Sequence, residues 1–354
     1  MGKKYEFCSV SPDREGKERW QNLLSQARYM NYLAAMPYEY TRSLNGRRTV
    51  TYIVTHESRD VAGFHLSLKD FLSGLFRTAD ILSGLVLADE PDEELLDGIA
   101  RFITGKSREF HATFLRINTW LPGTYSGSET SVAGTVTKAM VNNGLKKIRS
   151  GRWTYWIDLS TEEEKLLGAM KAQTRRKIRQ AAGAEILVET TDEYDDEKVS
   201  EFYELYWKLG NRKQFGLLSE QRFREEVKAL FESGATLFFL KYKGITINVA
   251  LATRYNYSSY YHGALNPVYK ELEGCPSPGH FMQWTMIRYM KEKGLSRYDM
   301  AYCPGPVPVE GHPSFDMWRF KYGFGGDAVE FLPVYGKSLQ PLRGRIFQFL
   351  YRNR

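Results

Sequence analysis

Apolar and polar positions follow the same order of periods in both halves of the chain. The first half has two strand-like runs, a helical pattern and another strand-like run, at residues 48–56, 61–68, 91–104 and 111–117. The second half has paired strands with a turn at Lys243-Gly244, another strand, a helix and a last strand, at residues 236–242, 245–255, 257–262, 279–292 and 296–301. This repetition predicts an α/β fold with two lobes of similar architecture, joined near residues 150–154. A separate helix is predicted over 20–30.

The segment between the lobes predicts one long basic helix. Ser160 followed by Glu163 has the pattern of a capping box, and Gly183 is typical of a residue that ends a helix. Its buried stripe is expected to consist of Leu167, Met170, Thr174 and Ile178, with the basic residues on the opposite face. A strand over 185–189 is expected to follow.

Basic residues outnumber acidic residues by 49 to 42, and the basic residues gather in two places. The predicted helix carries Lys165, Lys171, Arg175, Arg176, Lys177 and Arg179. The C-terminal segment, which has no acidic residue after Glu330, carries Lys337, Arg343, Arg345, Arg352 and Arg354. Two interpretations stay open, namely solvated helix faces and a surface that binds phosphates. Leu342, Ile346 and Leu350 are four residues apart, which predicts that a tail helix packs on the body and leaves only its arginines free.

The composition predicts a globular cytoplasmic protein without a resident metal. Hydrophobic residues make up 42% of the 354 positions and charged residues 26%, so the chain can bury a substantial core. The apolar stretch 71–87 is interrupted by Arg77 and Asp80, so we expect no integral membrane segment, and the N-terminus lacks the apolar run of a secretion signal. Three scattered cysteines argue against disulfides, and six histidines without HxH or HExxH spacing argue against a metal site.

Several motifs, in order along the chain, resemble the Fem family (FemABX type) of aminoacyl-tRNA-dependent peptidyltransferases. They are Trp153–Ser160, Met170-Lys171, Arg175–Ala181, Phe202-Tyr203, Gly210-Asn211-Arg212, Tyr260–Ala264, Trp284, Tyr298-Asp299 and Phe320–Gly326. The resemblance is strong from Trp153 to Phe331 and weaker before it, through Gly46-Arg47 and Leu115–Asn118. The long helical insertion of the larger family members is absent, so the chain is similar to the compact members.

The resemblance implies two tandem GNAT-like domains with mixed sheets. We expect the first domain at 1–152, the second at 153–335, and a basic segment at 336–354 that packs back on the first domain. The implied activity is transfer of an amino acid from aminoacyl-tRNA to the amine of a peptide-bearing acceptor, either a cell-wall precursor or a peptide natural product. Aminoacyl-tRNA would be a co-substrate, no cofactor is implied, and we expect a monomer.

The resemblance also implies roles for individual residues. Lys321 matches the family lysine credited with stabilising the oxyanion, and Phe320 would exclude water. The residues implied for acceptor binding are Arg212, Tyr260, Tyr261, Arg42 and Asn118. Because side chains alternate along a strand, only one of the two tyrosines is expected to face a cleft. Arg42 and Asn118 stand where wall-precursor-binding members carry a lysine and an acid, so Asn118 cannot be a general base. The residues implied for tRNA binding are Lys171, Arg175, Arg176, Arg179, Arg343 and Arg345.

Two other functions stay open. A CoA-dependent N-acyltransferase can share the fold, but it needs a Gly-rich turn at a helix N-terminus to hold pyrophosphate. The predicted helices open with Glu90-Pro91-Asp92 and Pro276–Gly279, neither of which is such a loop, and Gly323–Gly326 precedes a strand-like run. An RNA-binding module would use the basic helix and would leave the aromatic segment around Lys321 unexplained.

Overall fold

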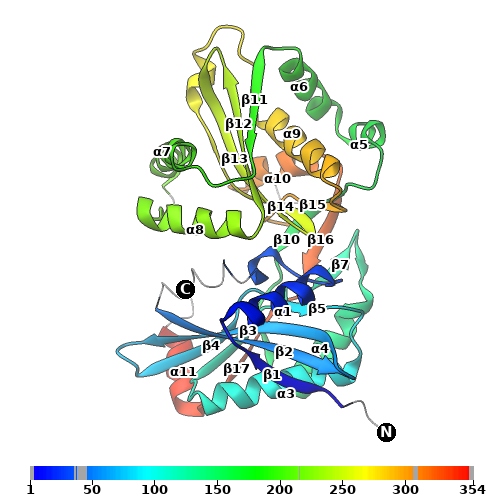
Figure 1. Cartoon of the computed structure of the whole chain (residues 1–354), viewed down its shortest axis with the longest axis vertical. Helices are drawn as coiled ribbons and strands as arrows, with labels where there is room; N and C mark the ends of the chain where they lie inside the picture. The colour runs from blue at the N-terminus through cyan, green and yellow to red at the C-terminus, as the bar shows by residue number, and fades with distance from the viewer. Residues whose placement is uncertain (1–3, 36, 38–45, 215, 306–309, 351–354) are drawn as a thin grey trace. The chain divides into compact units, whose positions relative to one another are not determined.

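The chain forms two compact α/β units in the computed structural model, which describes residues 4–35, 37, 46–214, 216–305 and 310–350 (Figure 1). Unit 1 comprises residues 1–152 together with 329–354, and unit 2 comprises residues 153–328. The predicted boundary after residue 335 is wrong, because the chain is already back in unit 1 at Val329. There Val329–Phe331 pairs with β7 (Pro122–Tyr125) before the next strand begins.

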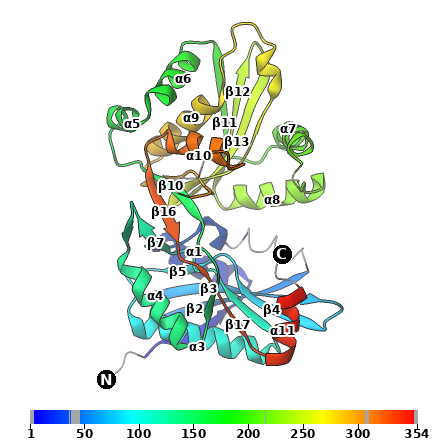
Figure 2. The same cartoon turned by 180° about the vertical axis from the view of Figure 1, so that it is seen from behind.

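Unit 1 is a sheet with helices on both faces (Figure 2). Its strands run in the order β1-β2-β3-β4-β6-β17-β9, with β5 paired to β3, and only β4 and β6 are parallel. The elements are β1 (Glu6–Val10), α1 (Arg14–Ser25), β2 (Arg47–His56), β3 (Arg59–Phe71), β4 (Phe76–Ile81), β5 (Leu85–Leu87), α3 (Glu93–Glu109), β6 (Phe114–Ile117), β7, β8 (Ser128–Glu129), α4 (Ser131–Asn142), β9 (Lys146–Arg149), β17 (Val334–Ser338) and α11 (Pro341–Leu350).

Alternation along β3 explains how both faces of this sheet are filled. Phe64 and Leu66 belong to the core that α3 and α4 complete, whereas His65 points to the other face and contacts Trp20 of α1, with ring centroids 4.4 Å apart. Gly63 also faces α1, and a Cβ there would lie 2.5 Å from the Trp20 ring. Successive side chains of a strand point to opposite faces, so β3 supports two layers of helices.

Unit 2 has the same layered construction. Its strands run in the order β11-β12-β13-β14-β15-β10-β16, with β14 and β15 parallel, and β16 begins at the end of this unit and continues into unit 1. The core beneath α9 is built from apolar residues of β10, β12, β13 and β15, and α7 and α8 pack against β14 and β12. The elements are β10 (Trp153–Asp158), α5 (Glu163–Ala169), α6 (Ala172–Ala182), β11 (Ile186–Thr191), α7 (Asp196–Lys213), α8 (Glu220–Glu232), β12 (Ala235–Tyr242), β13 (Ile245–Tyr255), β14 (Tyr257–Leu265), α9 (Gly279–Glu292), β15 (Arg297–Asp299), α10 (Phe315–Tyr322) and β16 (Asp327–Phe331).

The predicted first helix is wrong in its bounds. It begins at Arg14 rather than at Trp20, because Asp13 caps it by accepting a hydrogen bond from the Gly16 amide at 2.9 Å. It ends at Ser25, five residues before the predicted end. The strand predicted over 111–117 is likewise confined to Phe114–Ile117.

The long basic helix predicted between the lobes is two helices. The chain is extended at Met170, where α5 ends, and the Lys171 amide donates to the Gly323 carbonyl at 2.9 Å before α6 begins. The predicted capping box is also wrong, because the Ser160 hydroxyl donates to Asp158 and α5 has no side-chain cap. Met170, Thr174 and Ile178 are buried as predicted.

The C-terminal helix α11 packs on unit 1 through a different face from the one predicted. Leu342, Ile346 and Leu350 are more than half exposed, whereas Phe347 is buried against Phe76 and Phe114. The close approach of Gly344 to the Ser338 hydroxyl, where a Cβ would lie 1.9 Å from Oγ, fixes this orientation. Among the helices of the described ranges, none combines the length and the apolar character that a bilayer crossing requires.

Candidate functional site

Lys321, the residue implied for catalysis, is buried on the last turn of α10. Only 8% of the residue is exposed. Its ammonium donates to the carbonyl oxygens of Met300, Ala301 and Tyr302 at 2.5, 3.1 and 2.7 Å. An ammonium has three protons, so these three carbonyls use all of them.

The three carbonyls belong to the turn that follows β15. Ala301 has a φ of 60°, a left-handed backbone that a non-glycine residue rarely adopts. A buried polar network holds this turn. The Thr154 hydroxyl of β10 lies 2.5 Å from an Asp299 carboxylate oxygen and 2.9 Å from the Ala301 carbonyl oxygen, so these two acceptors share its single proton, and Asp299 also accepts from the Ala301 amide. The strained turn and the lysine therefore fix each other.

Burial lowers the pKa of Lys321 to about 8, because water no longer solvates its charged form. Asp299 and Cys303 oppose this effect through their charges but do not overcome it. No carboxylate of the described residues lies within ion-pair distance of the ammonium. The pKa of this ammonium is consequently close to neutral pH, and the dipoles of three backbone carbonyls, not a bonded carboxylate, hold its charge.

Aromatic rings surround this lysine on its own helix. Phe320 packs against His280 of α9, with ring centroids 4.7 Å apart, and Trp318 stacks on Tyr322 at 5.0 Å. Burial, with a smaller effect from Lys177, lowers the pKa of His280 to about 4, so this imidazole is neutral at pH 7. Phe320 is thus half-buried between Lys321's helix and α9, next to a neutral imidazole.

The glycines after Lys321 allow α10 to approach the basic segment closely. A Cβ on Gly323 would lie 2.5 Å from the Thr174 hydroxyl, and one on Gly325 would lie 2.3 Å from the Ala169 carbonyl. The same packing brings Lys171 over the Tyr322 ring, at 4.7 Å from its centroid. One predicted tRNA-binding residue is thus brought next to the helix of Lys321.

The other predicted basic residues differ in how free their charges are. Arg176, Arg179, Arg343 and Arg345 are exposed. The Arg175 guanidinium instead donates to the Gly168 carbonyl at 3.1 Å and to the Met170 carbonyl, so it caps the C-terminal end of α5. Arg175 therefore has a structural role that the sequence did not predict.

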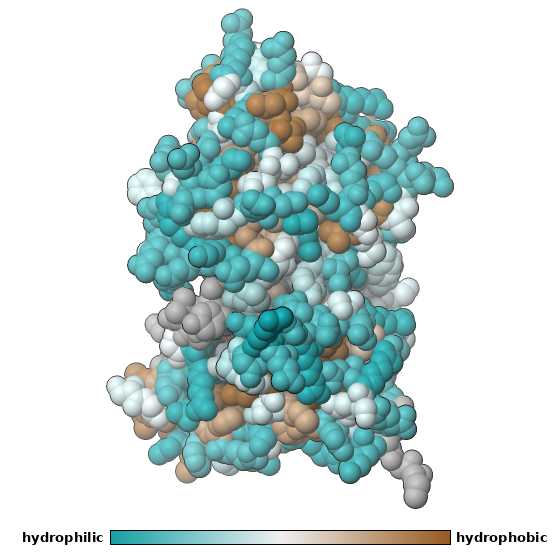
Figure 3. Space-filling model, viewed as in Figure 1, coloured by the Kyte–Doolittle hydropathy of each residue, from teal (hydrophilic) through white to brown (hydrophobic). Residues whose placement is uncertain are grey.

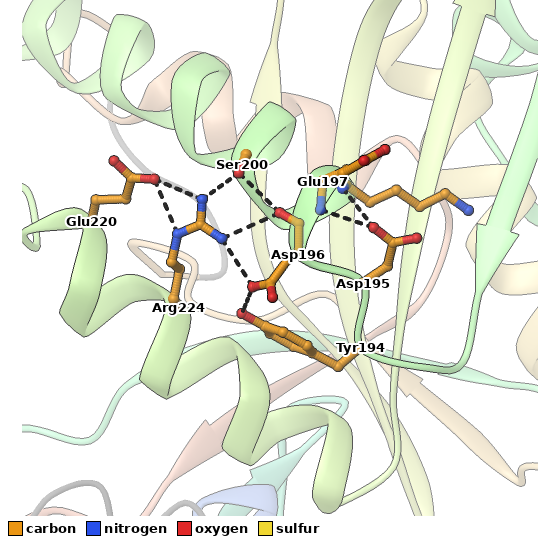
Figure 4. Close-up of polar contacts among 8 residues, drawn as sticks. Tyr194, Asp195, Asp196, Glu197, Ser200, Glu220 and Arg224 are labelled. Carbon is orange, nitrogen blue, oxygen red and sulfur yellow. Dashed lines mark hydrogen bonds and ion pairs between the residues drawn. The ribbon is translucent and has the colours of Figure 1, made fainter.

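Arg212, implied for acceptor binding, is exposed in the last turn of α7. The opposite end of this helix is firmly anchored (Figure 4). Asp195 caps it through the amides of Glu197 and Lys198, and Arg224 of α8 bonds Asp196 at 3.1 Å and Glu220 at 2.7 Å. These contacts position the helix, while the Arg212 guanidinium remains accessible to a ligand.

Tyr260 and Tyr261 lie at a β-bulge in β14. The register with β13 shifts there, so Tyr260 opposes Ala252 and Tyr261 is the extra residue. Tyr260 packs with the core beneath α9, and burial raises its pKa to about 12. The Tyr261 hydroxyl donates to Glu226 of α8, and its ring contacts His262 at 4.5 Å. The two tyrosines therefore contact different groups, and the bulge interrupts the strict alternation on which the sequence prediction for this pair rested.

Glu226 and His262 are polar neighbours that the sequence analysis did not assign. His262 also contacts Tyr206 of α7 at 5.2 Å, and burial lowers its pKa to about 4. Tyr261, His262 and Tyr206 thus form a half-buried polar cluster with Glu226 between α7, α8 and β14. Only the closeness of Tyr261 and His262 was visible in the sequence, because α7 and α8 are distant along the chain.

The remaining acceptor candidates belong to unit 1. Asn118 directly follows β6, and its amide donates to the Ile81 carbonyl at 3.0 Å. Arg42 lies outside the described residues. On the neighbouring strand β4, Asp80 is fully buried and bonds Arg116 of β6 at 2.6 Å and Arg47 of β2 at 2.9 Å. This ion cluster was not predicted, since its members come from three strands.

Among the described residues there is no group of three or more His, Cys, Asp or Glu side chains placed to hold a metal ion.

Comparison with known proteins identifies the fold. Residues 168–306 match the family model described as an acetyltransferase (GNAT) domain. The structure is similar to that of FemX, with a TM-score of 0.82 and 17% identity over 98% of this chain and 100% of that one. For a tandem GNAT protein from the clavulanic acid biosynthesis pathway, the TM-score is 0.54 and the sequence identity is 15%, over 94% of this chain and 98% of that one. For L-PGS from Bacillus licheniformis, the TM-score is 0.55 and the sequence identity is 12%, over 98% of this chain and 99% of that one.

No sequence among the curated proteins matches this chain. The structural likenesses confirm the resemblance predicted from the sequence at the level of the fold, which is that of two GNAT domains in tandem. This is an acyltransferase fold, and its GNAT match lies in unit 2, which also carries Lys321.

Proposed function

We propose that the protein is an aminoacyltransferase that moves an amino acid from aminoacyl-tRNA to the amine of a peptide-type acceptor, a peptidoglycan precursor or a peptide natural product. The observation that carries the proposal is the buried lysine of α10, held at the strained end of β15 in a chain that matches FemX over its full length. A desolvated cation is what the tetrahedral oxyanion of acyl transfer requires.

In the proposed reaction the acceptor nitrogen attacks the carbonyl carbon of the aminoacyl ester. A C–N bond forms, the C–O bond to the tRNA 3′-terminal ribose breaks, and the ribose oxygen leaves with a proton that the amine gives up directly or through water. Lys321 would stabilise the negative charge on the former carbonyl oxygen, exchanging its longest hydrogen bond, to Ala301 at 3.1 Å, for that oxyanion. Phe320 would keep water from competing with the amine.

The basic surface of α6 supports tRNA as the donor. Lys171, Arg176 and Arg179 are exposed, and Lys171 adjoins the helix of Lys321. These cations could contact the phosphates of an acceptor arm while its 3′-end reaches the lysine. Arg212 is the proposed anchor for a phosphate or carboxylate of the acceptor, because its guanidinium can bind such a group through two hydrogen bonds.

CoA is the less favoured donor, because neither helix N-terminus that could bind its pyrophosphate is suited to do so. In unit 2, α9 follows Pro276 and Pro278, which lack the amide protons that would cradle pyrophosphate. In unit 1, α3 begins with Asp92, Glu93 and Glu94, and Asp92 already occupies the Leu95 amide. These acids would repel a pyrophosphate.

The test measures label transfer from a pool of charged tRNAs, with acetyl-CoA in parallel, into low-molecular-weight acceptors from cell extract. We expect ribonuclease-sensitive labelling, and dividing the pool would identify the amino acid. Lys321→Met should lower the rate at least about hundredfold, as loss of one oxyanion donor does. Lys208→Met, at an exposed position on α7, is the matched control and should keep full activity. Labelling from acetyl-CoA alone, or full activity in folded Lys321→Met, would overturn the proposal.

A further inference from the structure

The helix α11 presents its apolar stripe to solvent. Gly344 and Phe347 face unit 1, so the opposite side of the helix carries Leu342, Ile346 and Phe349, at i, i+4 and i+7. These three residues are 77%, 52% and 83% exposed. Such spacing normally marks the face that a helix buries, and here the described part of the chain leaves it uncovered.

Two more exposed leucines adjoin this helix. Leu72 and Leu75, 56% and 51% exposed, lie in the turn between β3 and β4. The flanking residues Phe71 and Phe76 both contact Phe347, with ring centroids 5.4 and 5.7 Å away. The turn and α11 are therefore one continuous surface of unit 1, seen beside each other in Figures 1 and 2. Hydrophobic atoms are visible in this region, at the lower left of Figure 3.

Cations border the apolar stripe. On the helix, Arg345 and Arg343 lie on either side of the stripe, and both are exposed. Lys69 lies over the Phe71 ring at 5.3 Å near the turn. Asp70 is neutralised by Arg77 at 2.6 Å, and α11 has no acidic residue.

This arrangement points to one occupant. In a symmetric contact with a second copy, the arginines of both copies would meet around the apolar stripe without an acid to pair with. Nucleic acid would satisfy the arginines but would leave five apolar side chains in water. An anionic bilayer satisfies both, because apolar residues enter the acyl boundary while arginines bind lipid headgroups.

We propose that α11 and the β3–β4 turn form a surface that binds reversibly to anionic lipid bilayers. A helix of ten residues cannot span the bilayer, so it would lie in the plane of the interface. Binding by one short helix is weak, and the leucines of the turn and the arginines would supply the additional contacts that make it measurable. This proposal does not depend on the reaction that unit 2 catalyses.

The experiment is flotation of the full chain with vesicles of phosphatidylcholine alone or mixed with phosphatidylglycerol. We expect binding to the anionic vesicles, weakened by 0.5 M salt, and little binding to the neutral ones. Phe349→Ser and Ile346→Ser should each weaken binding about tenfold or more, since each removes an apolar side chain that the bilayer would bury. Arg343→Gln with Arg345→Gln should abolish the preference for anionic lipid.

Val141→Ser is the matched control, because Val141 is 58% exposed on α4 of the same unit and lies outside the proposed surface. It should bind as the wild type does. All variants keep Phe347, and an unchanged melting temperature would show that they are folded. Absence of wild-type binding, equal binding by Phe349→Ser, or a dimer in solution that Phe349→Ser dissociates would each overturn the proposal.

Discussion

Asp80 in unit 1 and Lys321 in unit 2 are both buried, and their environments act on the charge in opposite ways. Asp80 in unit 1 is fully buried, yet its pKa is lowered, because Arg116 and Arg47 together outweigh the burial that would raise it. Lys321 in unit 2 is almost as buried, but only backbone carbonyls contact its ammonium, and burial prevails and lowers its pKa to about 8.

This difference in environment gives Asp80 a structural role and makes the Lys321 ammonium better suited to a chemical one. A buried charge between two opposite charges stays ionised at every physiological pH, and its removal leaves the partners uncompensated. A buried charge held by dipoles has no such partner, so its charge is available to a reacting group and is sensitive to pH. Measurements at four residues would test this contrast.

The largest effect is expected at Asp80. Asp80→Asn should lower the free energy of unfolding by about 4 kcal/mol, since Arg47 and Arg116 lose their shared buried counter-charge. Asp70→Asn is the control: its ion pair with Arg77 is on the surface, so the loss should be about 0.5 kcal/mol or less. Urea unfolding, with hydrogen exchange in β4 and β6, measures both. Equal losses would mean that burial does not distinguish the two aspartates.

The sign of the pH dependence at Asp80 follows from its lowered pKa. The stabilisation is fully present above the ordinary carboxyl pKa and is lost as pH falls through the lower value of the folded state. Asp80→Asn should therefore remove part of the acid sensitivity of unit 1.

At Lys321 stability also rises with pH, but for the opposite reason: the fold disfavours the charged form of this group instead of favouring it. The folded protein binds this proton less tightly than the unfolded chain does, so the cost of burying the ammonium is present at neutral pH and is relieved as pH rises from about 8 toward 10.5. The stability of the wild type minus that of Lys321→Met should rise by at most about 1.4 kcal/mol per pH unit in this interval. Urea unfolding at several pH values measures the difference, and a flat difference would contradict the lowered pKa.

A smaller effect is expected at Thr154, which supports the carbonyl cage of Lys321. Thr154→Val removes the hydroxyl whose proton Asp299 and the Ala301 carbonyl share and should cost about 1–2 kcal/mol. Ser258→Ala is the control, because the Ser258 hydroxyl is buried and makes no hydrogen bond in the described structure. Thermal unfolding should show little change for Ser258→Ala; a similar loss in both would indicate that packing, not hydrogen bonding, sets the cost.

The smallest effect is expected at Arg175, a cation that carbonyls hold near the surface rather than in the interior. Arg175→Gln should cost about 0.5–1 kcal/mol, since α5 loses its C-terminal cap. Arg176→Gln, one residue away and exposed, should leave stability unchanged. Melting temperatures compare the two, and charged-tRNA binding in the same pair tests which arginine contacts the nucleic acid. An unchanged melting temperature in Arg175→Gln would show that this contact has no structural weight.

The sequence by itself determined the fold class, several central strands of both sheets and the resemblance that the structure confirms at the level of the fold. Apolar periodicity is a local property of the sequence. For this reason β2, β12, β13 and α9 begin and end within one residue of their predicted bounds. It also identified Lys321 as unusual, because aromatic residues flank it in the chain.

Only the tertiary structure decided the environment of each charge. Asp80 meets arginines from β2 and β6, and Lys321 meets carbonyls from a turn about twenty residues earlier, so no local pattern could assign either partner. The hydrogen bond from the Lys171 amide to the Gly323 carbonyl lies where the predicted basic helix is interrupted. Phe347 packs against Phe76 and Phe114, so the apolar stripe on the other side of α11 faces solvent. Periodicity states that a helix has an apolar face, but packing against the rest of the unit decides which face is buried.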